Sequence, residues 1–188
     1  MTDDGKNVLA AVQQVRKLLS EVSKMLLEAD AMMDHGGWGQ RFGSTTIAGS
    51  SYSINTPRGW MPSKVFRFYQ RPDAEAVIPC ISVLLESDYP KVKFDEPLVS
   101  GILMEYEKGD TLPSPGLLYG VSTWHLRVED RRDNGTIHSI EPRAVWPQES
   151  TAKKMISFAR PLVSMRSREN LEQLVVSPLL RILAETTE

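Results

Sequence analysis

The chain has 188 residues, of which 41% are hydrophobic and 24% are charged, and its net charge is −2 at neutral pH. This composition is typical of a globular protein and excludes a disordered or membranous chain. The balanced charge disfavours nucleic acid as a partner, because no bulk positive field draws the chain to a phosphate backbone.

The expected compartment follows from the same composition. No apolar run approaches the length of about eighteen residues that a membrane span needs, and the acidic N-terminus does not resemble a signal peptide. The single cysteine, Cys80, excludes an internal disulfide framework and a cysteine-rich zinc site. We therefore expect a cytoplasmic protein in a reducing compartment, with no membrane association.

The first predicted element is an amphipathic helix over residues 1–35. Its apolar residues recur at alternating spacings of four and three, and a second apolar row widens the stripe beyond the two positions in seven of a strict coiled coil. A helix of roughly thirty residues is about 45 Å long, so it must pack against its own domain, a second copy or a partner. Gly36 and Gly37 are expected to end the helix with a left-handed cap. The two rows are Val8, Val12, Val15, Leu19, Val22, Leu26, Ala29 and Met33, and Ala11, Leu18, Met25 and Met32.

Residues 36–62 form a segment rich in glycine, serine and aromatic residues, which predicts a loop with one strand over 45–52. Aromatic and arginine side chains favour binding hot spots, so the segment is a candidate binding surface. In the alternative reading, its rings fold back over the core as a lid. A nucleotide-binding glycine loop is excluded, because the glycine spacing is wrong and no helix follows. The candidate binding residues are Trp38, Arg41, Phe42, Arg58 and Trp60.

Residues 63–188 predict an α+β body with a mostly antiparallel sheet of five to six strands and terminal helices on one face. Pro79 is expected at the start of a strand or at a bulge, and Asn134-Gly135 is typical of a hairpin turn. Ser177 followed by Pro178 predicts an N-cap and a break or kink in the C-terminal helix. The expected strands cover 64–70, 77–86, 98–107, 117–130, 136–145 and 154–165, the last of them interrupted at Pro161, and the closing helix covers 169–185.

A metal site built on the histidines fails a geometric test. If Asn134 and Gly135 form a two-residue turn, His138 faces Arg131 across the predicted hairpin. His125 then lies about 20 Å away along the same strand, at 3.3 Å per residue. One metal ion does not bridge that distance, so we assign no metal ligand.

Catalytic assignments fail on similar grounds. Glu105 and Glu107 share one face of a strand, whereas Lys108, which a nuclease-like magnesium site would need beside them, points to the other face. Cys80 lies in an apolar strand, where cysteine behaves as a small hydrophobic residue. We therefore assign no catalytic residue and no cofactor.

The remaining interpretation is a non-enzymatic cytoplasmic protein that acts through protein–protein association, with the long helix mediating oligomerisation or docking. The first alternative is a small-molecule sensor or binding domain that uses residues 36–62 as a lid. The second is a hydrolytic enzyme whose carboxylates come from Asp95, Glu105, Glu107, Glu129 and Asp130.

Overall fold

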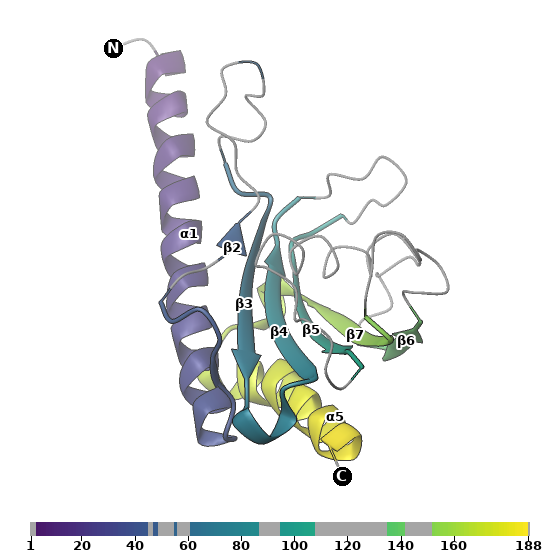
Figure 1. Ribbon diagram of the computed structural model, residues 1–188. Coiled ribbons are helices and arrows are strands. Elements are labelled where there is room, and N and C mark those ends of the chain that lie inside the picture. The colour runs from purple at the N-terminus through teal and green to yellow at the C-terminus, as the bar shows by residue number, and fades with distance from the viewer. Residues whose placement is uncertain are drawn as a thin grey trace.

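The computed structural model describes residues 3–44, 47–48, 55, 61–86, 95–107, 135–141 and 152–187. A long N-terminal helix, an antiparallel sheet and a C-terminal helix give an α+β fold, as predicted (Figure 1). Among the described helices, none has the length and apolar content that crossing a membrane requires. The elements in chain order are α1 (Asp3–His35), β1 (Gly39–Gln40), β2 (Ile47–Ala48), β3 (Lys64–Gln70), η2 (Pro72–Ala74), β4 (Val77–Leu84), β5 (Leu98–Glu105), β6 (His138–Ile140), β7 (Lys154–Pro161), η3 (Leu162–Ser164), α4 (Arg168–Leu171), η4 (Glu172–Val176) and α5 (Ser177–Thr187).

The end of α1 confirms the predicted glycine cap. Gly37 has a φ of 84°, in the left-handed region that glycine adopts without steric cost. The N–H of Gly37 donates to the Asp34 carbonyl, and the N–H of Trp38 donates to the Met33 carbonyl, both at 2.9 Å. This is the Schellman arrangement, which reverses the chain and brings Trp38 back onto the helix it follows.

The sheet is antiparallel throughout its described length, in the order β1-β3-β4-β5-β7-β6, with β2 also paired to β3. The predicted strand at Lys64–Gln70 is confirmed, and those at Val77–Leu84 and Leu98–Glu105 end two residues earlier than expected. The expectation for Pro79 is wrong. It lies inside β4 opposite Leu103 in continuous register, just outside the β3–β4 ladder, which ends at Cys80.

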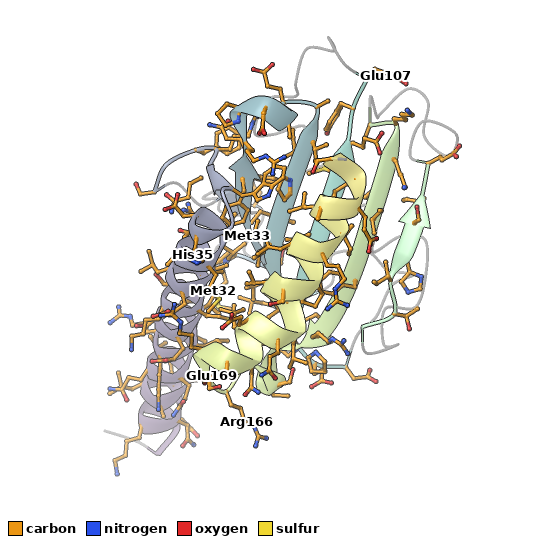
Figure 2. The ribbon with its side chains drawn as sticks, turned by 90° about the horizontal axis from the view of Figure 1, so that it is seen from below. Met32, Met33, His35, Glu107, Arg166 and Glu169 are labelled. Carbon is orange, nitrogen blue, oxygen red and sulfur yellow. The ribbon has the colours of Figure 1, made fainter. Side chains whose placement is uncertain are left out.

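Both faces of the sheet are buried. The C-terminal half of α1 and the helices after β7 pack on one face (Figure 2). This agrees with the prediction that the terminal helices cover one face of the sheet. Residues such as Val65, Ile81 and Leu103 belong to this helix-covered face. The alternate positions, such as Phe66, Cys80 and Ile102, form a second buried cluster on the opposite face. The near-continuous apolar character of β4 and β5 follows from burial on both sides.

Gly101 provides space for an aromatic ring in the centre of β5. A Cβ built at Gly101 would lie 2.4 Å from Cζ of Phe158, the residue opposite it on β7. The missing side chain of Gly101 lets the Phe158 ring lie directly over the backbone within the helix-covered core.

The C-terminal helix is irregular, as predicted, but the expected cause is wrong. Ser177 is not an N-cap: its φ and ψ of −62° and −42° are helical, and its N–H donates to the Glu172 carbonyl five residues back. The N-cap is Ser167, whose hydroxyl accepts from the N–H of Asn170 at 3.2 Å. A proline crowds the carbonyl four residues before it, so the wider π turn of η4 accommodates Pro178 without ending the helix.

Several predicted features lie outside the described residues. They include the strand over 117–130, most of the strand over 45–52 and the first residues of the hairpin turn. Within the described residues, the strand expected over 136–145 is present as β6, which pairs with β7.

Candidate functional site

The apolar stripe of α1 is buried in the C-terminal part of the helix and exposed in its N-terminal part. Val22, in its C-terminal part, is 4% exposed, whereas Val8 and Val12, in its N-terminal part, are 65% and 46% exposed. Figure 1 shows α1 extending past the ends of β3 and β4 on its N-terminal side. We define the inner stripe as Val22, Leu26, Ala29 and Met33, and the outer stripe as Val8, Val12, Val15 and Leu19.

The outer stripe changes gradually from exposed to buried. Val15 and Leu19 are half-buried, so the stripe enters the core over about one turn of helix. Leu9 and Leu18, on either side of the stripe, are also exposed and widen the apolar surface. Single exposed apolar side chains are common on proteins, whereas an aligned row of them on one helix is a candidate interaction surface.

A buried ion pair holds α1 on the sheet beside Ala29, near the C-terminal end of the inner stripe. The Arg67 guanidinium donates to both carboxylate oxygens of Asp30, from Nε at 3.0 Å and from Nη2 at 2.5 Å. Both side chains are almost fully buried. Such a two-point contact fixes orientation as well as distance, so it sets the angle at which α1 leaves β3.

Tyr69 completes this buried cluster. Its hydroxyl donates to Oδ1 of Asp30 at 3.0 Å. Burial raises the pKa of Tyr69 well above its ordinary value, and the negative charge of Asp30 raises it further. The phenol therefore stays protonated and remains a hydrogen-bond donor throughout the ordinary pH range. Sequence reasoning missed the cluster. The available signals were an aspartate next to Ala29 of the stripe and an arginine on the same strand face as Val65 and Tyr69.

A groove lies between α1 and β3, beside this cluster. We call it the β3-side groove; its volume is about 290 Å³. Apolar side chains of α1 form much of its lining, and Asp30 and Arg67 contribute charged groups. Gln40 and Ser44 come from the segment predicted to act as a lid. The lining residues are Leu19, Val22, Ser23, Leu26, Leu27, Asp30, Gln40, Ser44, Val65 and Arg67.

A second groove, of about 420 Å³, lies on the other side of α1, against the segment that runs from η3 into α4. We call it the α4-side groove. Its lining combines apolar side chains, such as Leu18, Met25 and Leu162, with charged ones. Two of the charged lining residues, Arg168 and Glu28, are 3.2 Å apart, and both side chains are largely exposed. Such an exposed pair adds little stability.

The structure separates the predicted aromatic binding residues. Trp38 is 2% exposed and belongs to the helix-covered core, where the Arg71 guanidinium lies 4.9 Å from its ring centre. Arg41 and Phe42 are half-buried, and Phe42 packs on the opposite face of the sheet. Arg58 and Trp60 lie outside the described residues. Thus Trp38 fits the lid-like alternative, whereas Arg41 and Phe42 keep part of their surface accessible.

Arg41 and Phe42 belong to a compact aromatic cluster. The Phe42 ring meets Phe68 edge-on at 6.0 Å between ring centres, and the Arg41 guanidinium lies 5.6 Å from the Phe42 ring centre. Burial lowers the pKa of Arg41 and raises that of the nearby Tyr106. Since each group contacts its neighbours through rings and backbone, the cluster stabilises the turn after β1.

Of the residues considered as catalytic groups, Cys80 and Glu105 lie among structural contacts. Cys80 is fully buried in β4, as predicted, and burial raises the pKa of its thiol. Glu105 contacts Lys153 at 3.7 Å at the end of its strand. Within the described part of the chain, no three His, Cys, Asp or Glu side chains gather in a group that could hold a metal ion. His125, Glu129 and Asp130 lie outside that part.

The chain matches no known protein family, and searches of curated proteins and of solved structures find no match either. The candidate site therefore rests on the geometry of this molecule. The outer stripe of α1 is its most prominent feature, and the two flanking grooves are secondary candidates.

Proposed function

We propose that this protein acts through protein–protein association, with the outer stripe of α1 packing against an apolar surface of a partner. The observation that carries the proposal is the continuity of one stripe across a buried half and an exposed half of a single helix. The inner stripe packs on the sheet, and the outer stripe presents the same spacing and residue types to solvent. The function proposed is that of an oligomerising or adaptor subunit.

The energetic scale favours a moderate association. Burying an exposed valine side chain contributes up to about 1.5–3 kcal/mol, so Val8 and Val12 together contribute several kcal/mol. Association costs at least about 4 kcal/mol in lost translational and rotational freedom. Neighbouring apolar residues such as Leu9 and Leu18 must therefore join the interface for a stable complex to form. We also propose that the protein acts in the cytosol, where its single cysteine thiol stays reduced.

Site-specific photo-crosslinking tests the proposal in the intact chain. A photoreactive phenylalanine derivative placed at Val12 is expected to form covalent adducts with a second polypeptide in the protein's native cells. The same group placed at Gln13, an exposed neighbour outside the stripe, is the matched control and should give no such adduct. A second probe is placed at Val8. If neither the Val8 probe nor the Val12 probe forms an adduct, the proposal is contradicted.

A small-molecule binding domain remains the second candidate, and a specific observation favours it. Gln40 and Ser44, from the segment predicted as a lid, line the β3-side groove together with the Asp30–Arg67 pair. A thermal-shift screen with nucleotides and metabolites tests this candidate. A ligand of this groove should lose its effect in a Ser44→Trp variant, which fills the groove.

A further inference from the structure

We infer that Ser82 and Ser100 together bind one internal water molecule, on the face of the sheet opposite the helices. The two serines lie directly across from each other on the central strands β4 and β5. Each is two residues from members of the second buried cluster, such as Leu84 and Ile102, so their side chains share that face. The site is separate from the outer stripe, and the inference does not depend on the proposed function.

The hydroxyl groups of both serines are buried without a protein partner. Within the described part of the chain, neither the Oγ of Ser82 nor the Oγ of Ser100 makes a hydrogen bond. Serines that face each other across a strand pair can bond directly, but these two do not. A buried hydroxyl without a partner is destabilising, and nearly all buried polar side chains bond to protein or to ordered water. Two adjacent unpartnered hydroxyls therefore indicate one shared partner that is not part of the protein.

Small side chains surround the two hydroxyls along the row that crosses the sheet. Ser100 pairs with Ala159 on β7, so three neighbouring strands carry small side chains at this level. The next pair along β4 and β5 on the same face is Leu84 with Leu98, which are much larger. A hydroxymethyl or methyl group reaches less far from the sheet than a leucine side chain does. The level of the serines is therefore where a small molecule fits with the least displacement of neighbours.

The surroundings of the serines favour water over an ion or a larger ligand. Their row continues to Phe66 on β3 and Ala159 on β7, so it carries no charge among the described strands, and a buried ion without a countercharge is strongly destabilised. Both serines are 0% exposed, which favours a guest that fits without an opening to solvent. A water molecule both donates and accepts hydrogen bonds, so it bonds the two hydroxyls whichever way each one points.

A high-resolution crystal structure of the wild-type protein tests the inference directly. A single water peak should lie within hydrogen-bond distance of the Oγ atoms of both Ser82 and Ser100. A site without a water peak overturns the inference, and so does a direct hydrogen bond between the two hydroxyls. Density for a molecule larger than water at this position would also overturn it, and would identify a ligand site instead.

Two variants test whether the serines hold the water in solution, where oxygen-17 relaxation dispersion counts long-lived internal waters. Ser82→Ala and Ser100→Ala each leave the water with a single partner and should each lose one such water, because a buried water needs at least two. Ser164→Ala is the matched control. The Ser164 hydroxyl already donates to the Pro161 carbonyl at 2.6 Å, so its removal should leave the count unchanged. A count that stays at the wild-type value in both Ser82→Ala and Ser100→Ala contradicts the inference.

Discussion

Asp30, Arg67 and Tyr69 show how a few buried polar residues determine where α1 lies. Their contacts join residues 37 and 39 positions apart in the chain, and they lie at the level where the helix meets β3. A purely apolar contact allows a helix to slide or rotate by small amounts, whereas a two-point ion pair allows one arrangement. These residues therefore direct the outer stripe as well as anchoring the inner one.

Asp30→Asn should destabilise the protein by about 3–5 kcal/mol, because it removes the negative charge that pairs with the buried Arg67 guanidinium. Urea unfolding of the variant measures this change. Glu21→Gln is the matched control. It breaks the exposed pair between Glu21 and Lys24, which are 3.0 Å apart, and should cost at most about 1 kcal/mol. Equal costs for the two variants would show that the buried pair does not anchor the helix.

Gly101→Ala should cost about 1–3 kcal/mol, because the added methyl group would overlap the Phe158 ring and force the core to rearrange. The same substitution in a Phe158→Leu background should cost clearly less, since the smaller side chain leaves room. Free energies of unfolding for the four members of this cycle measure the coupling. Additive costs would mean that the two residues do not compete for the same space.

At the scale of the elements, the C-terminal helix, which starts with α4, depends on Ser167. This residue caps the helix N-terminus, and its hydrogen bond with Glu169 is the main cause of the lowered pKa of that carboxyl. A folded-state pKa below the unfolded value means that the carboxylate stabilises the helix at neutral pH. This stabilisation is lost as the pH falls through the folded-state pKa.

Ser167→Ala should therefore cost about 1 kcal/mol at neutral pH and less in acid, and it should move the pKa of Glu169 back toward its ordinary value. Urea unfolding at two pH values and an NMR titration of the Glu169 carboxyl measure the two effects. Ser177→Ala is the control, because Ser177 lies inside the helix, where alanine is at least as favourable. An equal cost for Ser177→Ala would contradict the assignment of Ser167 as the N-cap.

The predictable parts of the fold are those that local spacing encodes. The alternation of four and three predicted α1, and the Gly36-Gly37 pair predicted its end, because both signals act within a few residues. Spacing alone did not tell which half of the stripe is buried, since that depends on where the sheet ends. The Asp30–Arg67 contact was not predictable either, because it is formed only when two distant elements meet.

At the scale of the whole molecule, pairing of two copies would couple association to folding. If two copies pair through the outer stripe, unfolding of one copy also breaks the pair, so the folded state gains stability as the protein concentration rises. The thermal midpoint of the wild-type protein should increase with concentration, and that of Val12→Gln should not. Differential scanning fluorimetry at a series of concentrations measures both. A concentration-independent wild-type midpoint would argue against coupling.

The short strands at the borders of the sheet have a consequence for aggregation. Within the described residues, β1 and β2 contribute two residues each on one side, and β6 contributes three on the other. A long unpaired strand is the usual template on which a foreign strand adds and from which amyloid-like fibrils grow. Borders this short offer few backbone groups for such growth. In the described part of the sheet, the border strands therefore present few backbone groups for edge-to-edge polymerisation, whereas α1 exposes an apolar stripe.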